Sequence, residues 1–509
     1  MSVREDFISE IQKTYNFKGD KIVLGCAKLD GEVIDQAEVS VALRTLNRHG
    51  LIAGATGTGK TKSLQILAEQ LSLKGVPSLV MDMKGDLSGI AAPGNADDKS
   101  IQYRQQLLGL DYEPAGAVSE LLTISHEPGV RLRATVLEFG PILFSKILEL
   151  NETQTDIMSI IFKYCDDNGL PVIDLKDIRK VLLYITENKN AADDLAKHYG
   201  RIASVSLDAI LRKIVTLEQQ DAERFFGEPS FEVNDLLQTK DGKGVVNIIR
   251  LTDIQNKPAL FSTFMLSLLA EVYQTFPEAG DLDKPKLVIF IDEAHLIFKQ
   301  ASKALINELE SIIKLIRSKG VGIIFCTQLP GDIPDAILSQ LGLKIQHALR
   351  GFTAKDRKQI QKAVENYPIS TFYKTDELIT QLGIGEAFVT ALNEKGIPTA
   401  LAYTYMRAPI SRMDVLAESE IDDLVSNSEL VSKYAKDIDN ESAYEILTKR
   451  MEAIPEIKEE EVKTKSQSRG RPKKKKSVIE SVFSNTTTKS YIRTFGNMII
   501  RGLLGKIIK

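Results

Sequence analysis

The feature that most constrains this chain is a glycine-rich loop at residues 54–61, which read Gly-Ala-Thr-Gly-Thr-Gly-Lys-Thr. The loop fits the pattern G-x-x-x-x-G-K-[ST] in full. The apolar residues before it predict a strand, and the residues after it predict a helix. Such a strand, loop and helix wrap backbone N–H groups around phosphate oxygens, with the positive end of the helix facing them. The chain is therefore expected to contain an α/β core that binds a nucleotide.

Each part of this loop has an expected role. Lys60 is expected to place its charge against the β and γ phosphates, and the Thr61 hydroxyl is expected to ligate Mg²⁺. The chain has no Asn-Lys-x-Asp sequence, which reads guanine, so ATP is the expected nucleotide. The backbone expected to surround the phosphates belongs to Gly54, Ala55, Thr56, Gly57, Thr58 and Gly59.

Apolar strands and helical spacing divide the rest of the chain. Strands are predicted in VPSLVMD, GVVNIIRL, KLVIFID and GVGIIFCTQ, and their order with helices predicts a mostly parallel sheet. Apolar residues such as Leu143, Ile147 and Leu148 recur at helical spacing. We expect an N-terminal adaptor at 1–50, a core at 51–139 and 241–416, a helical insertion at 140–240, a polar and partly disordered linker at 417–490, and an amphipathic segment at 491–509.

The composition excludes several classes of protein. The 65 Lys and Arg residues nearly balance the 69 Asp and Glu residues, so any affinity for nucleic acid must come from local patches. The three cysteines, Cys26, Cys165 and Cys326, have no metal-ligand spacing and favour a reducing compartment. No apolar run approaches the roughly 18 residues of a membrane span, and the first residues lack a signal pattern. A cytoplasmic protein without a membrane span is expected.

A pair of acids follows the strand predicted at residues 287–291. Asp292 and Glu293 would lie at the carboxyl edge of the sheet, where open α/β folds bind their ligands. Asp292 is expected to hold Mg²⁺ through its water shell. Glu293 is expected to act as the general base that activates the attacking water. The alternative is that both acids are solvated and cap the helix that starts at Ala294.

Three more side chains are candidates beside the nucleotide. Gln328 follows the strand at 321–326 and is expected to hydrogen-bond the γ-phosphate or the attacking water, unless it only satisfies local backbone. Arg317 lies in the last turn of a predicted helix, where the helix dipole alone favours a cation. Arg350 is expected to reach a γ-phosphate of its own or a neighbouring subunit, as an arginine finger does. Which arginine acts in this way stays open.

Other polar residues carry weaker expectations. Asp82, Lys84 and Asp86 follow a predicted strand at the same sheet edge, and they either take part in the chemistry or cap loops. The histidines form no ligand spacing and are expected to be structural; they are His49, His126, His198, His295 and His347.

Several runs together resemble the HerA-like branch of the HerA/FtsK ATPases. They are NRHGLIAGATGTGKTKSLQ, VMDMKGDLSGIA, LNETQTDIMSIIFKY, IFIDEAHLIF, RSKGVGIIFCTQLPGDIP and LGIGEAFVT. More narrowly, most of residues 20–415 is similar to the bacterial YjgR-type proteins, and so is the final run RGLLGKIIK. Most of these runs lie outside the phosphate loop, so the resemblance is more specific than the loop alone.

This resemblance implies a RecA-like core, a ring that is expected to be a hexamer, and ATP-driven translocation or unwinding of DNA. The residues that match the family's positions are Lys60 and Thr61 for the nucleotide, Asp292 and Glu293 for the acidic pair, and Gln328 for the sensor. The residues before the phosphate loop are too few for the β-barrel that HerA carries there. Interactions of that barrel, such as coupling to a nuclease, are therefore not carried over.

The end of the chain holds two further features. The tract Arg469-Gly470-Arg471-Pro472 followed by Lys473–Lys476 resembles an AT-hook, which lies in the minor groove of A·T-rich DNA. The alternative is a solvated basic linker that balances Glu459–Glu461. Residues 491–509 form an amphipathic stretch, expected to dock on the core or on a neighbouring subunit rather than on a membrane surface.

The sequence therefore predicts an ATP-hydrolysing ring motor that acts on DNA. The main alternative is an ATP-driven switch or remodeller whose partner is a protein. A small-molecule kinase is disfavoured by Glu293 and by the absence of a recognisable acceptor-binding lid.

Overall fold

The computed structural model describes residues 2–452, except residues 281, 301–302, 352, 437 and 439. The chain divides into two compact units. The described part of the core unit comprises residues 2–134, 219–225 and 229–436, and that of the helical unit comprises residues 135–218, 226–228 and 438–452. Within these ranges, no helix is both long enough and apolar enough to cross a membrane. The basic tract and the amphipathic segment predicted at the end of the chain lie outside the described residues.

The core unit is built on one sheet with the strand order β2-β1-β14-β13-β12-β3-β11-β10-β4-β9-β5-β6. From β12 to β6 every neighbouring pair is parallel. All residues of β10 are buried, as expected for a parallel strand covered by helices. The strands of this parallel part are β12 (Leu343–Gln346), β3 (Gly50–Ala53), β11 (Val321–Thr327), β10 (Leu287–Ile291), β4 (Ser78–Asp82), β9 (Val246–Arg250), β5 (Ser119–Thr123) and β6 (Val130–Arg131). The predicted α/β fold with a mostly parallel sheet is confirmed.

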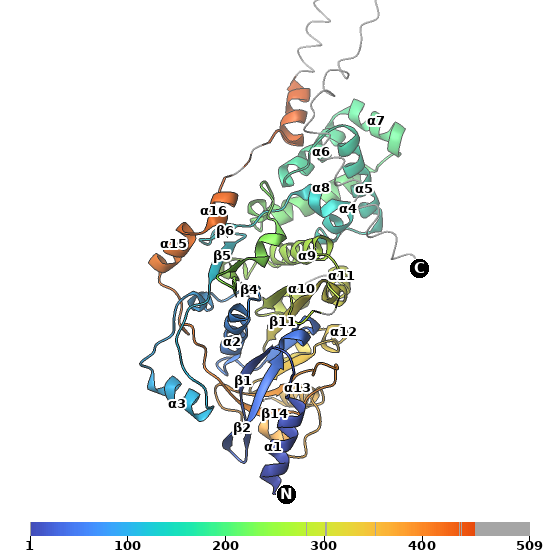
Figure 1. Cartoon of the computed structure of the whole chain (residues 1–509). Helices are drawn as coiled ribbons and strands as arrows, with labels where there is room; N and C mark the ends of the chain where they lie inside the picture. The colour runs from blue at the N-terminus through green and yellow to red at the C-terminus, as the bar shows by residue number, and fades with distance from the viewer. Residues whose placement is uncertain are drawn as a thin grey trace, which may run out of the picture. The chain divides into compact units, whose positions relative to one another are not determined.

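The other end of the sheet is antiparallel and includes part of the first fifty residues. β1 (Lys21–Leu29) pairs with β2 (Glu32–Ala42) on one side and with β14 (Ala402–Met406) on the other. β14 then pairs with β13 (Glu386–Thr390). Figure 1 shows the blue strands β1 and β2 beside the orange strand β14. The segment expected to be an adaptor thus supplies two strands of the core sheet.

Helices cover the strands of the core unit. The helix after the phosphate loop is α2 (Lys60–Leu73), in which Leu64, Leu67 and Leu71 are fully buried at helical spacing. Other helices of the described core unit are α1 (Val3–Thr14), α3 (Lys99–Leu107), α9 (Pro258–Thr275), α10 (His295–Gln300), α11 (Lys303–Ile316), α12 (Asp335–Leu338), α13 (Ala354–Val364) and α14 (Thr375–Leu378). A short hairpin joins β7 (Thr239–Lys240) to β8 (Lys243–Gly244).

The residues after 416 differ from the polar linker expected there. They form α15 (Glu418–Ser426) and α16 (Glu429–Tyr434). The Ser428 side chain caps the start of α16, and Tyr434 is buried with its carbonyl accepting a hydrogen bond from Arg133 at 3.0 Å. A few buried apolar side chains therefore attach this polar stretch to the core unit. Its composition alone does not predict this packing.

The helical unit contains α4 (Val136–Ile147), α5 (Glu152–Asp167), α6 (Leu175–Glu187), α7 (Lys189–Tyr199) and α8 (Ser204–Glu218). Thr135, Asn151 and Asp174 begin α4, α5 and α6 with capping boxes. These helices lie in the stretch where apolar spacing predicts them. The expected insertion extends to residue 240, whereas residues 219–225 and those from 229 onward belong to the core unit. Phe225, for example, belongs to the core unit because it packs edge-on against Phe264 of α9.

Candidate active site

The phosphate loop joins the carboxyl end of β3 to α2. Gly59 has a φ of 111° at the N-cap of α2, a conformation that L side chains rarely adopt. Lys60 begins the helix, is buried, and donates from Nζ to the Ala55 carbonyl at 3.2 Å. The Thr58 hydroxyl donates to the same carbonyl at 2.7 Å. The loop therefore curls around a lysine side chain, with Thr61 in the first turn of the helix.

Backbone hydrogen bonds from two later segments hold this loop in place. The Ala55 N–H donates to the Ala348 carbonyl, just after β12, at 2.8 Å. The Gly385 N–H, just before β13, donates to the Thr58 carbonyl at 3.1 Å. The run LGIGEAFVT thus contacts the phosphate loop directly, although more than three hundred residues separate them in the sequence.

The acidic pair lies at the same sheet edge as the phosphate loop. Asp292 and Glu293 directly follow β10, which β11 separates from β3 in the parallel sheet. Their exposed fractions are 2% and 5%. Burial, with the Glu293 charge adding to it, raises the pKa of Asp292 to about 6. Asp292 Oδ2 has no hydrogen-bond partner among the described residues. This buried carboxylate oxygen can therefore accept a hydrogen bond or bind a cation.

Glu293 has two partners that its position in the sequence does not predict. Lys84, from the loop after β4, forms an ion pair with Oε1, and His295 Nδ1 lies 3.1 Å from Oε2. The signal for Lys84 was its place after a strand at the same edge. Its pairing with Glu293 also requires that β4 be the neighbour of β10. Strand order of this kind is not readable from a single sequence.

Gln328 follows β11 directly, and it is exposed at the phosphate-loop edge. The turn there is held by Asp332, whose Oδ2 accepts from the Thr327 hydroxyl at 2.9 Å and from the Leu329 N–H at 3.2 Å. Neither hydrogen bond involves the Gln328 amide. The amide is therefore available to a ligand at the strand end.

The two candidate arginines lie at opposite edges of the sheet. Arg350 is exposed after β12, whose carboxyl end pairs with that of β3. Arg317 is exposed before β11, on the amino side of the strands. β11 spans Val321–Thr327, so its ends are about 20 Å apart at the usual rise per residue. Only Arg350 shares an edge with the phosphate loop of its own chain.

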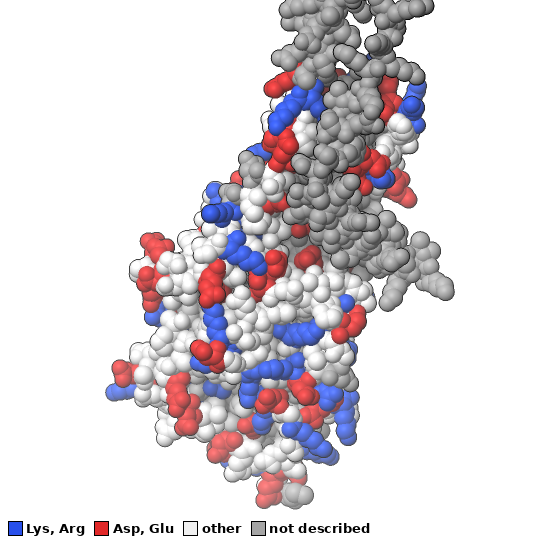
Figure 2. Space-filling model, turned by 45° about the horizontal axis from the view of Figure 1, so that its top comes forward, with Lys and Arg blue, Asp and Glu red and all other residues white. Residues whose placement is uncertain are grey.

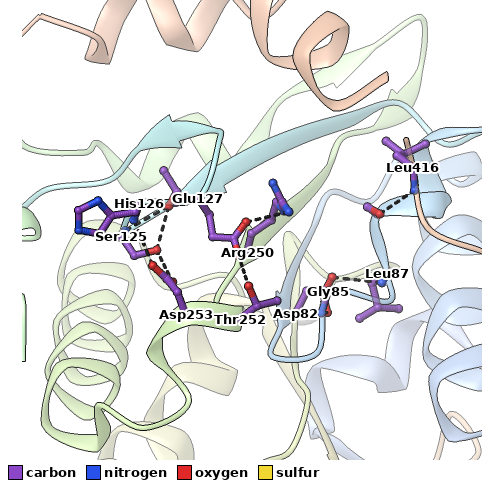
Figure 3. A network of polar contacts seen from close by, with 12 residues as sticks. Asp82, Gly85, Leu87, Ser125, His126, Glu127, Arg250, Thr252, Asp253 and Leu416 are labelled. Atoms are coloured by element: carbon purple, nitrogen blue, oxygen red, sulfur yellow. Dashed lines mark hydrogen bonds and ion pairs between the residues drawn. The ribbon is translucent and has the colours of Figure 1, made fainter. Parts of the chain in front are cut away.

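The loop after β4 is organised by a buried acid. Figure 3 shows the Asp82 carboxylate beside this loop, where it accepts the Gly85 N–H at 2.7 Å and the Leu87 N–H at 3.1 Å. Burial raises the pKa of Asp82 to about 6. Asp82 therefore caps the loop. The capped loop places Lys84 beside Glu293.

A second polar network lies beside this loop, at the ends of β5 and β9. Arg250 pairs with Glu127 at 2.7 Å, and the Thr252 hydroxyl donates to the same carboxylate (Figure 3). Asp253 accepts from the Ser125 hydroxyl at 2.6 Å. Because Glu127 pairs with Arg250 and Asp253 accepts from Ser125, we assign the network to holding the loops after β5 and β9.

The histidines, all expected to be structural, differ in their surroundings. His49 is buried at the amino edge of the sheet, and His295 pairs with Glu293. His347 is fully buried behind the phosphate loop, where its backbone N–H donates to the Ala53 carbonyl at 2.7 Å. The structure ends β12 at Gln346, so His347 directly follows a strand that ends at the phosphate-loop edge, as Asp292 does.

Comparison with known proteins identifies the family. Residues 28–509 match the family described as helicase HerA-like C-terminal. The chain belongs to this family. It is thus a P-loop ATPase, and the resemblance to the HerA-like branch is confirmed. The narrower likeness to the YjgR-type proteins stays a prediction.

Curated relatives of this HerA-like chain include proteins named DNA double-strand break repair helicase HerA. The protein from Sulfolobus acidocaldarius is 21% identical over 383 residues, which are 74% of this chain and 69% of that protein. The protein from Sulfurisphaera tokodaii is 23% identical over 347 residues, which are 67% of this chain and 63% of that protein. The HerA-like chain therefore spans about two thirds of the length of the curated relatives it matches.

Solved structures of the coupling protein TrwB share the fold. An unbound form of the bacterial conjugative coupling protein TrwBdeltaN70 has a TM-score of 0.51 at 14% identity, covering 80% of this chain and 94% of its own. Plasmid coupling protein TrwB in complex with ADP and Mg²⁺ has a TM-score of 0.50 at 14% identity, covering 78% and 97%. The likeness concerns the fold alone, and it agrees with the expected RecA-like core of the HerA-like chain.

Proposed function

We propose that the HerA-like chain is a motor that binds ATP with Mg²⁺, assembles as a hexameric ring and uses hydrolysis to move along DNA. The observation that carries the proposal is the joint position of the phosphate loop, the acidic pair and Gln328 at one edge of the parallel sheet. Relatives named as DNA repair helicases and the family match support it.

In this mechanism Lys60 neutralises the β and γ phosphates, and Gln328 orients the attacking water. Glu293 accepts the proton of that water as its oxygen bonds to the γ-phosphorus and the bond to the β-phosphate oxygen breaks. For this to happen, the Glu293 carboxylate must leave its ion pair with Lys84. The γ-phosphate brings negative charge to the same edge, which draws Lys84 away from the carboxylate.

The residues present fit Mg²⁺. Asp292 Oδ2 is a buried carboxylate oxygen without a partner among the described residues, and the Thr61 side chain lies in the first turn of α2. Mg²⁺ keeps several waters and needs only one or two protein oxygens beside the phosphates. When bound, it supplies positive charge to the phosphate oxygens. TrwB, which shares the fold, is known in complex with ADP and Mg²⁺.

A ring explains the position of Arg317. About 20 Å separates the two ends of β11, so this side chain does not reach the nucleotide of its own chain. In a ring, the amino edge of one subunit can face the phosphate-loop edge of the next, and Arg317 then stabilises the charge on the neighbour's γ-phosphate. Arg350 is the alternative, acting from the same edge as its own phosphate loop.

The described surface does not by itself indicate where DNA binds. On the face that Figure 2 presents, Lys and Arg side chains are interspersed with Asp and Glu. A mixed surface of this kind, with a formal net charge of -4, gives little general attraction for DNA. We therefore assign the contact to loops that line the ring and to the basic tract at residues 469–476.

ATP turnover measured with and without DNA tests the function, together with the mass of the assembly with and without ATP. Several-fold stimulation by DNA and an ATP-dependent ring are expected. Turnover that is indifferent to DNA would instead support the ATP-driven switch acting on a protein partner. Transfer of phosphate to an added small molecule would support a kinase.

Lys60→Ala tests the nucleotide site itself. The β and γ phosphates lose the buried ammonium that the loop encloses, so ATP binding is expected to be lost. Calorimetric titration with ATP and Mg²⁺ measures it. Undiminished affinity would reject the assignment of the phosphate loop.

A further inference from the structure

The side chain of His347 connects the phosphate-loop helix to the antiparallel part of the sheet. Its Nε2 lies 2.8 Å from the Ser63 hydroxyl in the first turn of α2, and its Nδ1 lies 2.9 Å from the Glu386 carbonyl at the start of β13. Both His347 and Ser63 are buried. The imidazole is therefore fixed at both nitrogens, between two elements that meet at the phosphate loop.

The roles of the two nitrogens follow from their partners. A carbonyl oxygen only accepts, so Nδ1 carries the proton that is donated to Glu386. Burial, with the charge of Lys60 adding to it, lowers the pKa of His347 to about 4, so the ring is neutral at pH 7. Nε2 of the neutral ring then accepts the hydrogen bond of the Ser63 hydroxyl.

The same side chain packs against two glycines of the loop. A Cβ added to Gly54 would lie 2.5 Å from the Cβ of His347, and one added to Gly59 would lie 3.5 Å from its Cε1. The residue that follows it also joins the loop, because the Ala348 carbonyl accepts from the Ala55 N–H. His347 thus contacts the loop at both ends and its helix at Ser63.

We propose that His347 is a positioning residue for the phosphate loop, and that its hydrogen bond with Ser63 holds the loop and the start of α2 in the geometry that binds ATP. The inference rests on the proposed function, since it concerns the same nucleotide site. It goes further by assigning a binding role to a histidine and a serine outside the phosphate-loop motif. A site whose geometry is already fixed in the free protein loses less conformational entropy when the ligand binds.

His49 offers a matched control within the same core unit. It is also buried, its Nε2 lies 2.9 Å from the Ile313 carbonyl, and its Nδ1 accepts the Ile323 N–H at 3.0 Å. It precedes β3, however, and so lies at the opposite edge of the sheet from the loop. His49→Asn removes one of these two hydrogen bonds at that opposite edge, away from the phosphate loop of its own chain.

The experiment compares five forms of the full-length chain. They are the wild type, Ser63→Ala, His347→Asn, the double variant and His49→Asn. The amide introduced by His347→Asn keeps a donor for the Glu386 carbonyl but cannot reach Ser63, and His49→Asn likewise keeps one of two hydrogen bonds. Calorimetry with a non-hydrolysable ATP analogue and Mg²⁺ measures affinity, and urea unfolding measures stability.

If the contact positions the loop, Ser63→Ala and His347→Asn each weaken binding roughly 5- to 20-fold, the effect of one hydrogen bond. The double variant then binds no more weakly than the worse single variant, because both remove the same contact. His49→Asn loses comparable stability but changes the affinity less than about 2-fold.

Unchanged affinity in Ser63→Ala and His347→Asn would overturn the inference, and so would an equal loss of affinity in His49→Asn. Should His347→Asn fail to fold, Ser63→Ala alone decides by the same criterion. Lys60→Ala separates this outcome from a failure of the proposed function. If the wild type binds ATP no better than Lys60→Ala, the nucleotide site itself is wrong and the inference falls with it.

Discussion

Glu293 combines an uncommon backbone conformation with a paired side chain. Its φ of 47° lies in the left-handed region, which costs a residue with a Cβ about 1 kcal/mol. The carboxylate is buried between the Lys84 ammonium and the His295 imidazole. Each of its two oxygens thus faces another side chain. The structure therefore corresponds to a resting arrangement of the proposed general base.

Glu293→Gln is expected to separate ATP binding from hydrolysis. The amide keeps the shape of the side chain but cannot accept a proton, so turnover is expected to fall roughly 10²- to 10⁴-fold. Binding is expected to persist because Lys60 and the loop are unchanged, and a ring with ATP bound would accumulate. Phosphate release and calorimetric titration measure the two quantities.

Glu278→Gln serves as the control for this variant. Glu278 pairs with Lys319 at 3.1 Å and is largely exposed, away from the acidic pair. Its turnover should match the wild type. Near-normal turnover in Glu293→Gln would place the base elsewhere and would return the kinase to consideration.

Among the elements, α2 links the phosphate loop to a segment near residue 411. Glu69 in its third turn is buried, and its carboxylate accepts the Ile410 N–H at 2.9 Å, the Ser411 N–H at 3.0 Å and the Ser411 hydroxyl at 2.7 Å. Burial raises the pKa of Glu69. One carboxylate thus satisfies several donors of a loop that is distant in sequence.

Glu69→Ala is expected to destabilise the core unit by about 2 to 4 kcal/mol, because it leaves three buried donors without an acceptor. Glu69→Gln keeps one acceptor oxygen and is expected to lose about half as much. Urea unfolding of both variants measures the difference. Equal stability of the alanine variant and the wild type would show that water replaces the carboxylate.

Local patterns predicted those elements whose signal lies within a few residues. The phosphate loop follows from eight consecutive residues, and the strands that became β4, β9, β10 and β11 follow from apolar runs. The pairing of β1 with β14 did not follow, because it joins segments almost four hundred residues apart. Its register depends on the whole sheet, not on any local preference.

The same distinction applies to the candidate site. Asp292 and Glu293 were located because they end a strand, and the ends of parallel strands share one edge. Lys84 was placed at that edge, but its contact with Glu293 depends on strand order. His347 also follows a strand, yet a lone histidine is more often structural, and only its contacts with Ser63 and Gly54 distinguish it.

For the molecule as a whole, buried histidines link stability to pH. Burial lowers the pKa of His49 from 6.5 to about 4. The unfolded chain therefore binds a proton between these values that the folded chain does not, so the stability contribution is lost as pH falls from 6.5 toward 4. From pH 7.5 to pH 5 the loss is about 2 kcal/mol.

Comparison of the wild type with His49→Asn isolates this effect, because the buried acids with raised pKa values, such as Asp82 and Asp292, are present in both. The difference in unfolding free energy between the two proteins should shrink by about 2 kcal/mol over this range. Urea titrations at several pH values measure it. A constant difference would mean that His49 takes up a proton in the folded state.

Removal of residues 469–476 tests how much of the DNA affinity comes from the basic tract. The tract contributes two arginines and four lysines, and each neutralised phosphate adds roughly 0.9 to the slope of log affinity against log salt. Deletion is expected to lower that slope by up to about 5, without changing ATP turnover in the absence of DNA. An unchanged slope would identify the tract as a solvated linker.

The placement of β1 beside β14 has a consequence for the synthesis of the chain. β1 and its hairpin partner β2 leave the ribosome early, but the strand that completes their pairing is made almost four hundred residues later. At ordinary rates of translation this delay lasts roughly 20 to 80 seconds. During that time one edge of β1 exposes unpaired N–H and C=O groups, which invite pairing with another nascent chain. The sheet that carries the nucleotide site can close only after nearly the whole core has been translated.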